Sequence, residues 1–278
     1  MTATIAAPPS RRTQRTTTHA GSSLAASTVA IAGRTVRKFV RTPQLIVIGI
    51  LQSTMFLLIF RYVFGGAIGT PGVSYVNFLV PGFVAANVLF CGTGTSVGVA
   101  EDMEGGFTDR LRSLPMPRLS VIAGRALADT ALLALILAVT VGVGFAVGFR
   151  LGGSIVAGVA AFALCIVFGF ALEWFFILLG VLAGNAQAAQ GMAMIVFPLT
   201  FVSSAYVPVA SMPGWMQAFA RNQPVTTTVD AVRSMTLGSH AEAVLGHSTG
   251  YLVGRSLIWC AVLAVAFAPI TVARFRRA

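Results

Sequence analysis

Charged residues are scarce in this chain, and their scarcity excludes an ordinary soluble protein. Only 10% of the 278 residues are Asp, Glu, Lys or Arg, against about 25% in soluble globular domains. Hydrophobic residues make up 56% of the chain, and the mean hydropathy is positive. The apolar residues form long runs, several of which reach the ~20 residues that a membrane-crossing helix needs. The composition therefore predicts an all-α, polytopic membrane protein.

Lysine, cysteine and histidine are also rare. The positions of the few that are present argue against a phosphate-binding loop, a disulfide framework and a metal site. The only lysine, Lys38, follows Arg37, so the Gly-Lys-Ser/Thr sequence of a phosphate-binding loop is absent. Cys91, Cys165 and Cys260 fall inside separate apolar runs, without the close spacing of a zinc site or a disulfide framework. The three histidines are scattered over tail and loop. We expect no metal, no cofactor and no catalytic residue in this chain.

Basic residues outnumber acidic ones by 19 to 8 and cluster at the ends of apolar runs. This placement fits the positive-inside rule better than a nucleic-acid-binding surface. Six spans are expected, at about 44–64, 77–100, 121–148, 154–183, 187–208 and 251–273. An even number places both termini on one side, where the termini and the 101–125 region hold 14 of the 19 basic residues. We expect a multi-pass protein of the cytoplasmic membrane, with both termini cytoplasmic and no nucleic-acid partner.

The chain before the first span divides in two. Residues 1–23 are rich in Thr, Ser, Ala and Pro and predict a disordered cytoplasmic tail. Residues 24–41 predict an amphipathic helix, and residues 42–278 form the transmembrane domain. One stripe of this helix is basic, and it consists of Arg34, Arg37, Lys38 and Arg41. The helix is expected to lie in the interface, with this stripe toward anionic headgroups or a partner; the alternative is an ordinary positive-inside flank.

A charged stretch, residues 101–117, separates the second and third spans and holds four of the eight acidic residues. So many charges are too costly in hydrocarbon, which predicts a water-exposed loop. Phe107, Leu111 and Leu114 recur at i, i+4 and i+7 and predict a two-turn amphipathic helix over 107–114. Its apolar face would press on lipid headgroups or enter a groove on a soluble partner.

Polar side chains inside the spans are candidates for a substrate path. Asn87, Cys91 and Thr95 form one stripe at four-residue spacing, and Glu173 is the ionisable residue expected deep in a span without a basic partner on its own helix. The candidates near the fifth span are Phe197, Thr200, Phe201, Ser203 and Ser204. Hydroxyls and aromatic rings without fixed charge suit hydrophobic or amphipathic compounds. The alternative is that these groups only hydrogen-bond neighbouring helices together, and Glu173 has the same alternative.

The segment before the last span is too apolar for a free loop and is broken by Pro213 and Pro224. It predicts two short helices, about 213–221 and 225–237, that dip into the outer face of the membrane, as broken helices do where they pack on protein.

The order of these features resembles the permease subunit of the ABC-2 transporter family, most of all the daunorubicin-resistance-type exporters of actinobacteria. The residues that carry the resemblance are Glu101-Asp-Met-Glu-Gly-Gly-Phe-Thr-Asp-Arg-Leu-Arg-Ser-Leu-Pro-Met-Pro-Arg118, Gly124-Arg-Ala-Leu-Ala-Asp129, Pro213-Gly-Trp215 and Asn222-Gln-Pro-Val225 through Asp230-Ala-Val-Arg233. The resemblance covers nearly the whole chain after residue 24.

The resemblance implies the six-span ABC-2, or type V, exporter fold, with a connecting helix at 24–41 and re-entrant outer helices. It also implies a coupling helix at 107–114 that enters a groove on a separate ATP-binding subunit. The coupling residues would be Phe107, Asp109, Arg110, Leu111 and Leu114. Two permease chains, identical or related, would pair with two ATPase subunits, which bind the ATP and Mg.

The implied function is export of a drug or lipid by a subunit that is not itself an enzyme. Export of a polysaccharide, an ion-coupled secondary transporter and a membrane-embedded enzyme remain as alternatives. The absence of clustered polar catalytic groups disfavours the enzyme, and the lack of an internal repeat disfavours the secondary transporter.

Overall fold

A computed structural model describes residues 23–70, 72–107 and 117–277, and the described part is helical without strands. This confirms the all-α prediction. The elements are α1 (Leu24–Arg41), α2 (Pro43–Tyr62), α3 (Tyr75–Glu104), α5 (Arg118–Ala146), α6 (Ile155–Ala183), α7 (Ala186–Ala193), α8 (Val196–Phe201), η1 (Val209–Ser211), α9 (Gly214–Asn222), α10 (Pro224–Leu237), η2 (Gly238–His240), α11 (Ala241–Leu245) and α12 (Thr249–Arg277).

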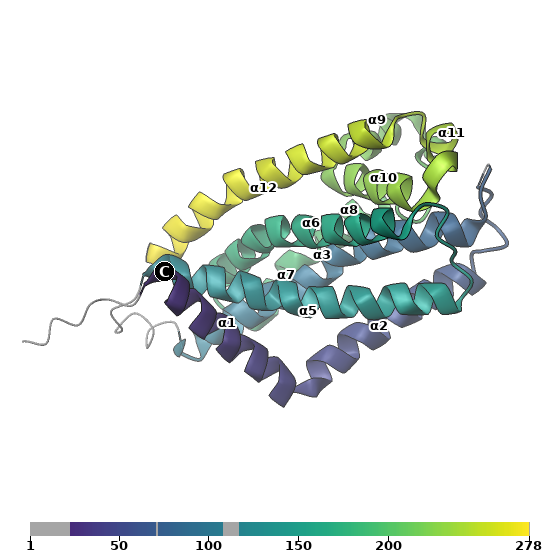
Figure 1. Cartoon of the computed structure of the whole chain (residues 1–278). Helices are drawn as coiled ribbons and strands as arrows, with labels where there is room; N and C mark the ends of the chain where they lie inside the picture. The colour runs from purple at the N-terminus through teal and green to yellow at the C-terminus, as the bar shows by residue number, and fades with distance from the viewer. Residues whose placement is uncertain (1–22, 71, 108–116, 278) are drawn as a thin grey trace, which may run out of the picture.

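Five helices of the described part are long and apolar enough to cross a membrane: α2, α3, α5, α6 and α12. They run lengthwise through one elongated bundle (Figure 1). α3 has the largest share of buried residues among them, whereas few residues of α2 and α12 are buried. Pro81 lies inside α3, and Phe83 and Leu79 beside it belong to the largest hydrophobic cluster. The central position of α3 lets it contact elements at both ends of the bundle.

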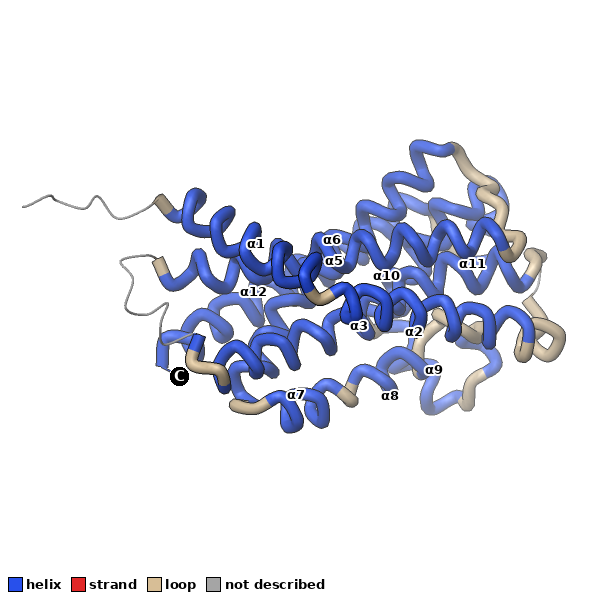
Figure 2. Tube along the Cα trace, turned by 90° about the horizontal axis from the view of Figure 1, so that it is seen from below, coloured by secondary structure: helices blue, strands red, loops and turns tan. Residues whose placement is uncertain are grey.

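The two ends of the bundle differ in what they carry. α1 begins at Leu24 and α12 ends at Arg277, and both of these helix ends lie at one end of the bundle, here called the terminal end (Figure 1 and Figure 2). The short helices α9, α10 and α11 gather at the opposite end, here called the far end (Figure 1). α10 packs between α3, α6 and α12, so the helices expected at 213–221 and 225–237 correspond to α9 and to a buried α10.

The segment expected to be a single span at 187–208 is broken into two helices. α7 ends at Ala193, α8 runs only from Val196 to Phe201, and the two follow one another along one side of the bundle (Figure 2). Pro198 is the physical reason, because its ring removes a donor and crowds the carbonyl four residues before it. That carbonyl belongs to Met194, which lies in the break.

The amphipathic helix expected at 24–41 is α1, which lies along α5. Its buried side includes Ile31 and Phe39, whereas Val29 and Val40 remain exposed. Gly124 of α5 permits the close approach, since a Cβ there would lie 2.7 Å from the carbonyl oxygen of Thr28. The exposed valines give α1 an apolar surface beside its basic residues, as an interfacial helix requires.

Candidate functional site

A cavity of about 330 Å³ opens between α1, α2, α3, α5 and α7. The stripe expected on the second span forms one wall, because Asn87, Cys91 and Thr95 all line this cavity. Their four-residue spacing repeats with the turn of α3 and keeps the three side chains on one face. Phe90 and Leu133 supply apolar parts of the lining. The volume falls within the range of small-ligand pockets.

A chain of hydrogen bonds fixes one part of the cavity wall. The Asn87 amide donates to the Ser53 hydroxyl over 2.7 Å, and the Ser53 and Thr140 hydroxyls share a bond of 2.7 Å. The Thr140 hydroxyl also lies 2.8 Å from the carbonyl oxygen of Ile136. These bonds join α2, α3 and α5, so the polar groups here have a structural use as well as a place on the wall.

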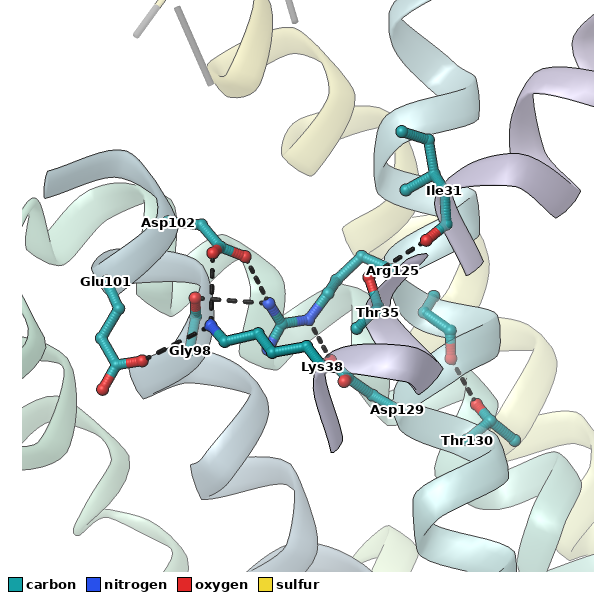
Figure 3. A network of polar contacts seen from close by, with 10 residues as sticks. Ile31, Thr35, Lys38, Gly98, Glu101, Asp102, Arg125, Asp129 and Thr130 are labelled. Carbon is teal, nitrogen blue, oxygen red and sulfur yellow. Dashed lines mark hydrogen bonds and ion pairs between the residues drawn. The ribbon is translucent and has the colours of Figure 1, made fainter. Parts of the chain in front are cut away.

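An ionic cluster lies beside the cavity, and Lys38, Glu101, Arg125 and Asp129 belong both to the cavity lining and to the cluster (Figure 3). The Arg125 guanidinium lies at its centre and donates to Asp129 at 2.6 Å, to Asp102 at 2.7 Å and to the carbonyl of Gly98 at 3.3 Å. Lys38 of α1 approaches Asp102 at 3.4 Å and Glu101 at 3.8 Å. The cluster therefore joins α1, α3 and α5.

The backbone leaves room for this arginine at Gly98. A side chain at Gly98 would collide with the Arg125 guanidinium. Taking an arginine out of water is costly unless its donors are satisfied and its charge is paired. Two carboxylates and a carbonyl meet that requirement for Arg125, whose planar fork suits several acceptors at once.

The sequence predicts Arg125 among the basic residues of the 101–125 region on the cytoplasmic side, at the start of the span expected at 121–148, and the structure buries it. Arg125 is only 8% exposed, because α1, α3 and α5 converge on it. Glu173 is therefore not alone among ionisable residues inside the bundle. The sequence reasoning also overlooked Asp102 and Asp129 as site residues. One signal was present: Arg125 and Asp129 stand at i and i+4, the spacing of an ion pair on one helical face.

Glu173 lies behind the cavity wall and is 3% exposed. Thr95 lies beside both the Asp129 and the Glu173 carboxyl groups. Glu173 Oε2 has no hydrogen-bond partner among the described residues. Thr95 carries a single hydroxyl proton and can donate to only one of the two carboxyls. Because the neighbouring Asp129 is held by Arg125, a second negative charge at Glu173 is disfavoured.

The aromatic candidates form a row of rings that starts at the cavity. Phe90 lines the cavity and meets the Phe197 ring edge-on at 5.1 Å between centroids. Phe197 stacks with Phe201 at 6.5 Å, and Phe201 lies 5.3 Å from Tyr206. The row leads from the cavity along α8 toward the far end, and it offers apolar surface alongside the polar stripe.

The hydroxyl candidates of the fifth span are buried and bonded within the fold. Thr200 donates to the carbonyl of Val196, and Ser203 donates to the carbonyl of Thr200. Ser204 donates to Asp230 at 2.7 Å. Thr200, Ser203 and Ser204 are not among the residues that line the cavity. The structure thus brings Asn87, Cys91, Thr95 and Phe90 together and leaves these three hydroxyls in packing.

A second arginine, Arg233, is buried at the far end of the bundle and is only 1% exposed. It donates to the carbonyl of Phe78 at 3.1 Å, to the carbonyl of Ser204 at 2.9 Å and to Asp230 at 3.1 Å. Its guanidinium carbon lies 3.7 Å from the centre of the Phe78 ring. The i, i+3 spacing of Asp230 and Arg233 was the available signal for this pair. α10 is therefore joined to α3 and to the turn after α8.

The predicted coupling segment falls mostly outside the described residues, which include Phe107 but not Asp109, Arg110, Leu111 or Leu114. The Arg34 guanidinium carbon lies 3.5 Å from the centre of the Phe107 ring, a cation–π contact. Arg37 and Arg41 of α1 are exposed at the surface. The start of the segment thus contacts the helix that also carries Lys38.

No group of three or more metal-ligating side chains occurs within 23–70, 72–107 and 117–277. The arrangement of the site is that of a binding cavity beside fixed ion pairs, with rings and hydroxyls along its walls.

Comparison with known proteins identifies the family. The family profile described as ABC-2 type transporter matches residues 26–237. The chain is 34% identical over 244 residues to "Daunorubicin resistance ABC transporter permease protein DrrB1" of Streptomyces coeruleorubidus, covering 87% of this chain and 83% of that one. It is 23% identical over 244 residues to "Probable doxorubicin resistance ABC transporter permease protein DrrC" of Mycobacterium tuberculosis, covering 87% of both chains. With its apolar helices, the chain belongs to the ABC-2 type transporter family, as a membrane permease similar to those of drug-resistance exporters.

Proposed function

We propose that this permease moves hydrophobic or amphipathic compounds out across the cytoplasmic membrane, powered by a separate ATP-binding subunit. The observation that carries the proposal is the cavity of about 330 Å³ with Asn87, Cys91 and Thr95 along one wall. Apolar surface supplies affinity for such compounds, and a few polar groups set their orientation. The relatives named for daunorubicin and doxorubicin resistance support a drug as the substrate.

The aromatic row supports a path that leads away from the cavity. Phe90, Phe197 and Phe201 continue from the cavity toward the far end, and planar apolar compounds stack favourably on such rings. A strongly anionic polysaccharide would gain little from rings, and the cavity offers it no surplus positive charge, because Lys38 and Arg125 on the lining are balanced by Glu101 and Asp129. These features favour an amphiphile over a polymer.

The terminal end is placed in the cytoplasm in this proposal, with the far end outside. The basic residues of α1 and of the last turn of α12 support this orientation, which follows the positive-inside rule. In this orientation the cytoplasmic side carries Arg34, Lys38 and Phe107. The helices α9 and α10 lie at the outer face, where they would gate the exit of the transported compound.

A second permease chain, identical or related, is proposed to cover the open side of the cavity. α2 contributes Leu45 and Ile48 to the lining and also exposes Val47 and Leu51. Continuous apolar surface beside a cavity supports a helix-packing contact there. In this arrangement α7 and α8, with α9 after them, complete the sixth crossing between the two sides.

Two ATP-binding subunits, which hold the ATP and Mg, are proposed to dock at the terminal end through residues 107–114. The contact of Phe107 with Arg34 and the ion pair of Lys38 with Asp102 support a route from that segment to the cavity. Asp102 binds Arg125, and Arg125 lines the cavity. A displacement of the docked segment would therefore reach the cavity through the Phe107–Arg34 contact, α1 and these ion pairs.

The test compares two threonines that differ in their relation to the cavity. Thr95→Val changes the cavity wall, while Thr228→Val removes a buried hydroxyl that bonds Ser256 away from the cavity. Export of several amphiphiles is measured in vesicles that contain the permease and its ATPase. We expect Thr95→Val to alter the ranking of the compounds and Thr228→Val to leave the ranking unchanged.

Three results would contradict the proposal. Equal, uniform losses from both variants with lowered expression would assign Thr95 to packing alone. Transport driven by an ion gradient without the ATPase would indicate a secondary transporter. Export of a sugar polymer without export of any amphiphile would indicate a polysaccharide permease.

A further inference from the structure

A second hollow lies at the far end, away from the cavity described above. It is a groove of about 430 Å³ between α3, α5, α6 and α10. Its walls come from side chains such as Val84, Phe145, Val159 and Val232, and Thr236 is its one hydroxyl. That hydroxyl already donates to the carbonyl of Val232 at 3.0 Å. The groove therefore offers hydrocarbon surface and no free polar group of a side chain.

One arginine stands at the rim of this groove. The Arg150 guanidinium donates to the carbonyl of Phe149 at 3.1 Å and lies 3.5 Å from that of Phe145, and both phenylalanines line the groove. Its backbone N–H donates to the Asn77 side chain at 3.0 Å, which fixes the residue on α3. Arg150 is exposed, and both carbonyl contacts use only Nη1, so that, among the residues that the structure describes, Nε and Nη2 remain as donors for a bound group.

We propose that this groove binds one phospholipid of the adjacent leaflet, with an acyl chain in the groove and its phosphate on Arg150. The neighbouring α5 and α6 are long apolar helices, so the mouth of the groove faces hydrocarbon. A guanidinium matches the geometry of a phosphate, and its position at the membrane boundary matches a headgroup above a buried chain. A lipid bound here contacts α10, and it would hold that helix against α5 and α6.

A second permease chain fits this surface less well. A two-fold interface uses the same patch from both copies, so it would place two exposed Arg150 side chains on one contact without an acidic partner from the groove lining. The phosphate of a lipid instead supplies the missing negative charge.

The test uses two matched pairs of variants in the full-length permease purified with its ATPase. Val159→Trp fills the groove, whereas Val156→Trp places the same bulk three residues earlier on α6 and outside the lining. Both positions are exposed, at 64% and 78%, so both variants should fold. Arg150→Gln removes the rim charge, and Arg221→Gln removes an exposed charge at the same end that bonds Gln217.

Delipidated protein is titrated with phosphatidylglycerol, and bound molecules are counted by native mass spectrometry, with hexadecanol as the chain without a phosphate. We expect one tight phosphatidylglycerol site, weakened about tenfold by Val159→Trp and by Arg150→Gln, as loss of a charged hydrogen bond predicts. Val156→Trp and Arg221→Gln should leave it unchanged, and Arg150→Gln should not affect hexadecanol. Equal binding by the two Trp variants, no effect of Arg150→Gln, or loss of permease dimers in Val159→Trp would overturn the proposal.

Discussion

Two arginines use the same arrangement at opposite ends of the bundle. Arg125 and Arg233 each donate to a nearby aspartate on their own helix and to a carbonyl of α3. A lysine could not reproduce either site, because a single ammonium lacks the planar fork that reaches separated acceptors. The residue type at each position therefore follows from the geometry around it.

Replacing Arg125 by Gln should destabilise the permease by about 3–5 kcal/mol, because Asp129 and Asp102 would lose their shared counter-charge in a buried place. The free energy of unfolding is measured in detergent with a chemical denaturant. Arg37→Gln is the control, since Arg37 is exposed and, within the described part of the chain, bonds only the carbonyl of Gly33, and its effect should stay within about 0.5 kcal/mol. If the two variants lost equal stability, the ionic cluster would have no special role.

Replacing Glu173 by Gln should preserve export, whereas replacing it by Ala should reduce it. Burial disfavours the charged form of a carboxyl, and an amide keeps the shape of the neutral carboxyl and its capacity to donate and accept hydrogen bonds. The measurement is the initial rate of export with the ATPase present, normalised to the amount of permease. Loss of export in Glu173→Gln at normal expression would show that a negative charge at this position is required.

At the scale of the element, α1 depends on one glycine of α5. Gly124→Val should push α1 away from α5, because a Cβ at position 124 would lie 2.7 Å from the Thr28 carbonyl oxygen and 2.8 Å from the Ile31 side chain. We expect faster tryptic cleavage after Arg37 and Arg41 and weaker retention of the ATPase. Gly142→Ala is the matched control, since a Cβ at Gly142 meets nothing within 4 Å. Equal cleavage rates in the two variants would refute the packing role.

The segment 107–114 should couple the permease to its ATPase through its apolar face. Leu111→Asp should abolish co-purification of the ATPase while leaving membrane insertion intact, since a charge in an apolar groove is costly. Asp109→Asn, on another face of the same predicted helix, should have a smaller effect. Wild-type co-purification and compound-stimulated ATP turnover in Leu111→Asp would remove the docking role.

The long helices could be predicted because each corresponds to a long apolar run in the sequence. The site could be predicted only where its residues lie on one helix. Apolar runs located α2, α3, α5, α6 and α12, and the spacing on α3 placed Asn87, Cys91 and Thr95 on one wall. The break at Met194 was readable from Pro198. The meeting of Lys38, Asp102 and Arg125 was not readable, because it depends on how three helices pack. Thr95 between Asp129 and Glu173 required the same knowledge.

At the scale of the whole molecule, the purified permease alone should not hydrolyse ATP, since the chain has no Gly-Lys-Ser/Thr sequence. ATP turnover is measured on the permease, on the ATPase and on the complex reconstituted in lipid. We expect turnover only where the ATPase is present, with stimulation by amphiphiles in the complex. Turnover by the permease free of any ATPase subunit would contradict the proposed division of labour.

Arg125 and Arg233 both donate to backbone carbonyls of α3, and this links the two ends of the bundle through one helix. The two carbonyls that they grip belong to Phe78 and Gly98, twenty residues apart, which is about 30 Å along a helix. α3 is therefore held at two points along its length, one toward each end of the bundle. A displacement of the loop after Glu104 would therefore act on both contacts through one helix, with Pro81 as the point between them where α3 can bend.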